Sequence, residues 1–245
     1  MNTRGEWQER LSWLCATTHQ RSLPVFIYKY GRVRPGVLMK WRQRQLTDRL
    51  AKKIELLTEE YGLGTNGPDV IAHSFGTWLI GHVLMEHPSL RIGRLILAGS
   101  ILRPDFDWNR PIGRRQVEAV LNHVAVQDAW VPLAQWVVPD SGPSGKKGFP
   151  HQPIVHREAG DFRHSSFFEE NVMERNYEGV WDVFLGRPDE RLSELQVGHP
   201  AAAWRERPRL LRELARLVVL SSLVALGTLL VLSSVVGFTE MVNRL

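Results

Sequence analysis

Short apolar runs alternate with longer segments of helical spacing along most of the chain. In residues 39–61, Leu46, Leu50, Ile54 and Leu57 recur at steps of four or three, which places them on one helix face. The pattern predicts helices over 6–16, 39–61, 76–87, 166–174 and 178–186, and strands over 25–30, 70–71, 94–102, 117–126 and 154–159. Strands that alternate with helices indicate an α/β fold, a mostly parallel sheet with helices on both faces.

The strand at Val70-Ile71 runs directly into Ala72-His73-Ser74-Phe75-Gly76, where a serine follows a small residue and precedes glycine. A serine between a buried strand and a helix is typical of a nucleophile elbow, which exposes the hydroxyl at the end of a sheet. The alternative is that Ser74 only caps the following helix, a common role for serine. His73 is expected to pack beside the nucleophile rather than react.

A nucleophilic serine needs a carboxylate that orients its base, and the best candidate is Asp128. This residue lies just after the strand predicted over 117–126, so the sheet topology brings it to the same edge as Ser74. Aspartate also favours turns, which is the competing interpretation. Asp105 and Asp140 are the alternative carboxylates.

The base itself is expected to be His164, in a loop that follows the strand predicted over 154–159. It completes the chain order Ser, Asp, His that an α/β-hydrolase scaffold uses. His151 and His156 are the alternatives, and His156 lies within the predicted strand, where a structural role is expected. The histidines show no metal-ligand spacing, so we expect neither a metal nor another cofactor.

The motifs Ala72-His73-Ser74-Phe75-Gly76, Gln127-Asp128 and Phe162-Arg163-His164-Ser165 together resemble the α/β-hydrolase superfamily, in its lipase/esterase-like branch. The resemblance covers about residues 1–186, with alanine at the first glycine of the usual elbow. It implies acyl-enzyme hydrolysis of an ester, thioester or amide, with the Phe75 N–H as one oxyanion donor.

The resemblance also implies strands before residue 25, one of which ends in a His-Gly-type loop that supplies the second oxyanion donor. Residues 2–7 resemble the segment after such a loop, so we expect that strand and donor to lie upstream of Met1. A misassigned start is the interpretation favoured over gene decay or loss of catalysis.

A second hydrophobic feature lies near the C-terminus, where residues 217–238 contain 22 positions without a charge. That length matches the roughly 30 Å of a bilayer core, so we expect a single transmembrane helix in preference to a buried core helix. Five arginines precede the segment and one follows it: Arg205, Arg207, Arg209, Arg212 and Arg216, then Arg244. This bias predicts a cytoplasmic N-terminal domain. The small pairs Ser221/Ala225 and Ser233/Gly237 indicate possible self-association through this helix.

The net charge of +5 and the pI of about 9.6 fit either an arginine-rich solvated surface or attraction to an anionic membrane face. No nucleic-acid motif accompanies the charge, so nucleic acid is not an expected partner. Cys15 is the only cysteine, which rules out an intrachain disulfide. Its apolar helical surroundings favour a core position over a nucleophilic role.

The sequence therefore predicts an α/β-hydrolase-like domain over 1–186, a linker and basic segment over 187–213, and a transmembrane helix with a short tail over 214–245. The expected function is that of a membrane-anchored serine hydrolase acting on an ester, thioester or lipid-like acyl substrate. The alternative is a catalytically impaired module that binds or regulates at a membrane.

Overall fold

Four parallel strands in one sheet form the centre of the part of the chain that the structure describes. The computed structural model describes residues 6–18, 25–28, 40–186, 192, 194–198, 208, 210–219 and 221–222. The strands are β1 (Val70–His73), β2 (Ile92–Ala98), β3 (Val117–Ala125) and β4 (Val155–Ala159), in the order β1-β2-β3-β4. Because all three strand pairs are parallel, the segments that follow the strands meet at one edge of the sheet.

The central strand β2 is buried on both of its faces. Every residue of β2 is buried, and Leu95 and Leu97 pack in one hydrophobic cluster while Ile96 and Ala98 pack in another. Successive side chains of a strand point to opposite faces, so this alternation requires a helical layer on each side.

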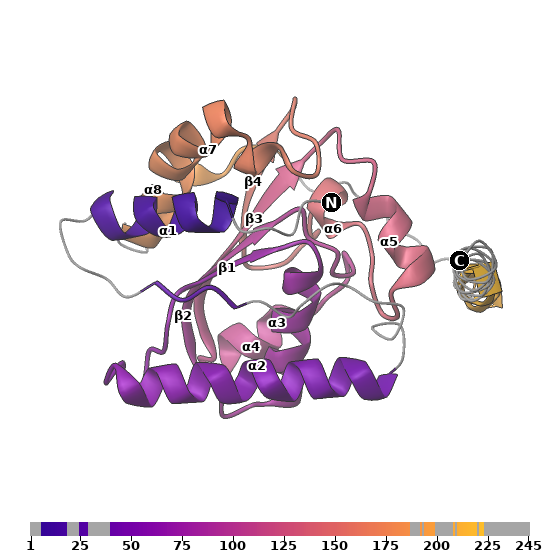
Figure 1. The fold of residues 1–245 in the computed structure, drawn as a ribbon, viewed down its shortest axis with the longest axis horizontal. Helices are drawn as coiled ribbons and strands as arrows, with labels where there is room; N and C mark the ends of the chain where they lie inside the picture. The colour runs from indigo at the N-terminus through magenta and orange to yellow at the C-terminus, as the bar shows by residue number, and fades with distance from the viewer. Residues whose placement is uncertain are drawn as a thin grey trace, which may run out of the picture.

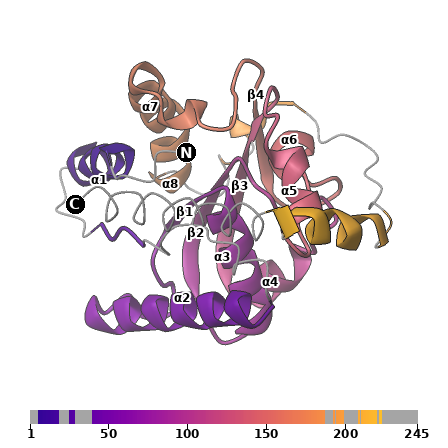
Figure 2. The same cartoon turned by 45° about the vertical axis from the view of Figure 1, so that its right-hand side comes forward.

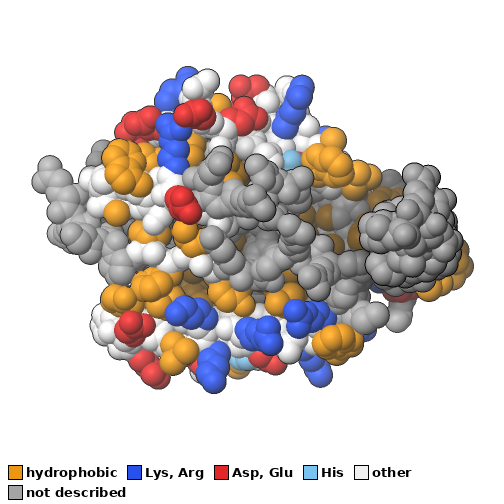
Figure 3. Space-filling view, viewed as in Figure 1, with side chains coloured by type: hydrophobic (Ala, Val, Ile, Leu, Met, Phe, Trp, Pro, Cys, Tyr) orange, Lys and Arg blue, Asp and Glu red, His pale blue; other side chains and the backbone are white. Residues whose placement is uncertain are grey.

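The first layer contains α2 (Lys40–Glu60), α3 (Phe75–Glu86) and α4 (Asn109–Gly113), which lie together below the sheet in Figure 1. Ala51 and Ile54 of α2 and Val83 of α3 are buried in the same cluster as Leu95. The opposite face of α2 is solvated and carries charges of both signs, and Figure 3 shows lysine and arginine side chains along it together with acidic ones.

The second layer combines the N-terminal helix α1 (Glu6–Thr18) with the segments after β4. These segments are η2 (Ser166–Phe168), α7 (Glu170–Asn176), η3 (Tyr177–Trp181) and α8 (Asp182–Gly186), and Figures 1 and 2 show α1, α7 and α8 on the same side of the sheet. Leu192 and Leu195 are buried in the hydrophobic cluster that contains Ile96 and Ala98, and Val197 forms a parallel bridge with Arg157 of β4. Leu192, Leu195 and Val197 therefore pack against the domain.

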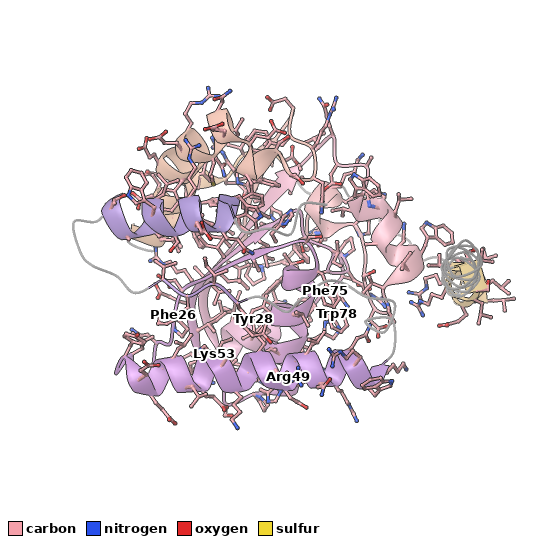
Figure 4. All side chains as sticks on the ribbon, viewed as in Figure 1. Phe26, Tyr28, Arg49, Lys53, Phe75 and Trp78 are labelled. Atoms are coloured by element: carbon pink, nitrogen blue, oxygen red, sulfur yellow. The ribbon has the colours of Figure 1, made fainter. Side chains whose placement is uncertain are left out.

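The strand predicted over 25–30 is wrong for the residues that the structure describes there. Residues 25–28 are not part of a strand, and residues 29 and 30 lie outside the described ranges. Phe26 instead packs against Tyr61 with the two rings tilted and their centroids 5.2 Å apart, and the Lys53 ammonium lies 5.5 Å from the Phe26 ring centroid. Figure 4 shows Phe26 and Tyr28 beside α2, so side-chain packing on a helix takes the place of strand pairing.

The predicted transmembrane helix needs the same kind of correction. Within the described ranges, no helix is long and apolar enough to cross a membrane. Helical residues 210–219 carry Arg212, Glu213 and Arg216, and Arg216 pairs with Glu213 at 2.6 Å, so this helix is charged rather than uniformly apolar. Residues 223–238 of the predicted span lie outside the described residues. The predictions of a transmembrane helix and of a single-pass localisation are therefore not retained.

Candidate active site

The junction between β1 and α3 consists of Ser74 alone, in a backbone conformation that few non-glycine residues adopt. Its φ is 52° and its ψ is −120°, while β1 ends at His73 and α3 begins at Phe75. Such a conformation costs on the order of 1–3 kcal/mol and persists only where the surrounding structure enforces it. The sharp strand-to-helix turn is the geometry expected of a nucleophile elbow.

Three hydrogen bonds hold this turn in place. The Ser74 N–H donates to the Ala98 carbonyl at 3.1 Å, which extends the pairing of β1 with β2 by one residue. The buried hydroxyl of Thr77 donates to the Ser74 carbonyl at 2.6 Å and accepts from the Ile101 N–H at 3.1 Å. Thr77 therefore ties the elbow to the segment that follows β2.

The structure brings Ser74, His164 and Asp128 together in one chain of hydrogen bonds. His164 Nε2 lies 3.0 Å from Ser74 Oγ, and His164 Nδ1 lies 2.7 Å from Asp128 Oδ2. The His164 and Asp128 side chains are 6% and 0% exposed, so both hydrogen bonds form away from bulk water.

The second carboxylate oxygen of Asp128 accepts two backbone N–H groups, from Trp130 at 2.7 Å and from Val131 at 2.9 Å. Burial raises the pKa of Asp128, but the hydrogen bond from His164 and these backbone donors outweigh it and hold the pKa below its usual range. An ionised carboxylate accepts a hydrogen bond from His164 Nδ1–H, which leaves Nε2 as the acceptor for the Ser74 hydroxyl.

The alternative candidates are engaged elsewhere or lie at the surface. Asp105 forms a surface ion pair with Arg103, and Asp140 is exposed. His156 is buried and its Nε2 accepts the Phe149 N–H at 2.8 Å, which is a structural role. His151 is exposed.

Phe75, the predicted oxyanion donor, is the first residue of α3. The N–H groups of a first helical turn point toward the helix N-terminus, where they favour negative charge. The Phe75 ring stacks on Trp78 with 5.4 Å between ring centroids, and Figure 4 shows the two residues close together. The expected second donor upstream of residue 1 stays a prediction.

Cys15 lies half-buried in α1, where it packs against the hydrophobic cluster that contains Ile96 and Ala98. Burial raises its pKa, more than the hydrogen bond with Tyr177 lowers it, so the protonated thiol is favoured. In the described part of the chain, no group of three or more His, Cys, Asp and Glu side chains is arranged to hold a metal ion.

Two residues beside the site were not predicted to act on it. His73 was expected only to pack, yet its Nε2 lies 3.0 Å from the carbonyl oxygen of His164. Gly99 directly follows β2 and lies against the His164 ring. The sequence marks Gly99 only as a glycine at the carboxyl end of a strand, which is a weak signal.

Compared with known proteins, the chain matches no protein-family model, no curated protein and no solved structure. The resemblance to α/β-hydrolases therefore stays a prediction from the motifs, and any functional argument depends on the geometry of the site itself.

Proposed function

We propose that this protein is a serine hydrolase that acts on an ester, thioester or lipid-like acyl substrate. The observation that carries the proposal is the continuous chain of hydrogen bonds from Asp128 through His164 to Ser74. A buried carboxylate, a histidine with a fixed tautomer and a serine on a strained turn are the parts that nucleophilic acyl transfer requires.

The geometry supports a two-stage reaction. Ser74 Oγ attacks the acyl carbonyl as His164 Nε2 takes its proton, and the Asp128 carboxylate stabilises the imidazolium that forms. The Phe75 N–H stabilises the negative oxygen of the tetrahedral intermediate. His164 then protonates the leaving group, and an acyl-enzyme remains. In the second stage, water attacks the acyl-enzyme ester as His164 takes its proton. The bond to Ser74 Oγ then breaks, His164 returns the proton to Ser74, and the carboxylic acid leaves.

The surface next to Asp128 favours an apolar acyl group. Trp130 and Leu133 are 68% and 52% exposed, although large apolar side chains usually bury most of their area. Trp130 lies two residues from Asp128, and its backbone N–H binds that carboxylate. The inner face of α5 (Val131–Val137) packs through Val131 in the cluster of Phe75 and Trp78, which leaves the outer apolar residues available to substrate.

Hydrolysis of p-nitrophenyl esters with acyl chains of increasing length tests this function. The wild-type protein should hydrolyse them, and Ser74→Ala should lower kcat by a factor on the order of 10⁴ or more. Ser165→Ala, at an exposed serine next to His164, is the matched control and should keep wild-type activity. Wild-type activity in Ser74→Ala would exclude Ser74 as the nucleophile.

A further inference from the structure

His164 is held from two sides by residues outside the triad. On one side the His73 ring lies 4.8 Å from the His164 ring, centroid to centroid, and His73 Nε2 lies 3.0 Å from the His164 carbonyl oxygen. On the other side Gly99 lies so close that a Cβ added to it would come within 3.2 Å of His164 Nδ1 and 3.4 Å of His164 Cε1. Both contacts act on the residue that must exchange protons with Ser74.

The protonation of His73 follows from its partner. A carbonyl oxygen can only accept a hydrogen bond, so His73 Nε2 is protonated and its N–H donates to the His164 carbonyl. Burial, with a smaller contribution from the neighbouring His164, lowers the pKa of His73 to about 4, so the ring is neutral near neutral pH. Its orientation is fixed by edge-on contacts with Trp7 at 6.2 Å and Phe168 at 4.8 Å.

Gly99 is required at its position for two separate reasons. Its φ is +55°, a region that side-chain-bearing residues rarely adopt. The His164 ring and the His164 carbonyl both lie within 3.6 Å of the position of a Cβ, so any side chain would push the imidazole away from its place. The glycine thus lets the base lie directly on the end of β2.

We propose that His73 and Gly99 are positioning residues that set the distance between the His164 imidazole and the Ser74 hydroxyl. His73 is adjacent to Ser74 in the chain and is bonded to the backbone of His164, so one residue links nucleophile and base directly. This inference rests on the proposed hydrolase function. A displacement of about 1 Å in a catalytic group can lower the rate on the order of a hundredfold, so loss of the contacts that position His164 should lower kcat measurably.

The first test removes and then restores the hydrogen bond from residue 73. His73→Leu fills the space without a donor, whereas His73→Gln offers an amide Nε2–H at a similar distance from the backbone. We expect His73→Leu to lower kcat for ester hydrolysis about tenfold to a hundredfold with KM changed less than about threefold, and His73→Gln to recover most of the loss. Equal kcat values for the two variants, or an unchanged kcat in His73→Leu, would overturn the role of His73.

The second test compares two glycines that both have a positive φ, only one of which contacts His164. Gly99→Ala introduces a Cβ against His164, whereas Gly62→Ala introduces one at a similar φ of +58° with nothing within 4 Å. Both variants should lose thermal stability through backbone strain, Gly99→Ala more than Gly62→Ala because of its contact with His164, but only Gly99→Ala should lose kcat. Equal kcat in the two variants would overturn the role of Gly99.

Ser74→Ala, assayed in parallel, separates the two claims. If Ser74→Ala is active, the hydrolase proposal fails. If Ser74→Ala is inactive and the variants at positions 73 and 99 keep wild-type kcat, only the positioning role fails.

Discussion

Replacement of Asp128 by asparagine is the perturbation whose consequence follows most directly from the structure. Asp128 Oδ1 accepts the N–H groups of Trp130 and Val131, and these two bonds orient the side chain. In Asp128→Asn the amide oxygen keeps both bonds, so the amide nitrogen must face His164 Nδ1, which lies 2.7 Å from Oδ2 in the wild-type protein.

Two donors would then face each other, and His164 must move its proton to Nε2 to relieve the conflict. Nε2 could no longer accept the Ser74 proton across their 3.0 Å hydrogen bond. The same tautomer change in a serine protease triad lowers the rate on the order of 10⁴-fold. That factor corresponds to about 5 kcal/mol of lost transition-state stabilisation.

The assay is the second-order rate of reaction with a fluorophosphonate probe, which reports nucleophile activation for any substrate preference. Asp128→Asn should react about 10⁴ times more slowly than the wild-type protein. Asp105→Asn is the matched control, because Asp105 forms only a surface ion pair and such pairs contribute at most about 1 kcal/mol. A rate for Asp128→Asn within tenfold of wild type would refute the assignment of Asp128 as the orienting carboxylate.

Two further predictions concern stability. Thr77→Val should lower the free energy of unfolding by about 1–3 kcal/mol, because it leaves the buried Ile101 N–H and the Ser74 carbonyl without the hydroxyl, whereas Thr77→Ser should retain most of it. Urea unfolding measures both, and equal losses would contradict the role of the hydroxyl. Burial, and to a smaller extent the charge of Arg157, lowers the pKa of His123 to about 3 in the folded protein. Below pH ~6.5 the unfolded chain therefore binds more protons than the folded protein, and the free energy of unfolding falls as the pH is lowered. This histidine alone should remove about 2 kcal/mol between pH 7 and pH 5, and His123→Gln should flatten the measured slope by that amount; an unchanged slope would contradict it.

Local sequence patterns predict much of the fold. Residues 95–98 of β2 are apolar without alternation, which is the pattern of a strand buried on both faces, and the helix steps of Leu46, Leu50 and Ile54 mark the face of α2 that packs. Residues 25–28 show where such patterns fail. These residues have the composition of a strand, but a strand forms only where a neighbouring strand is available for pairing. Phe26 packs instead against Lys53 of α2 and against Tyr61, which directly follows α2.

The site divides in the same way. The order of Ser74, Asp128 and His164 places each after a strand, and parallel topology then brings all three to one edge. The contacts of His73 and Gly99 with His164 depend on how a loop after β4 folds back over β1 and β2. Such long-range packing has no periodic signal in the sequence.

The most direct test of the account is the identity of the residue that a fluorophosphonate modifies. The purified protein is treated with the probe and digested, and the adduct is located by peptide mass spectrometry. We expect one adduct, on Ser74, and no adduct in Ser74→Ala. An adduct on another residue, or a wild-type protein that remains unmodified, would contradict the central claim that Ser74 is an activated nucleophile.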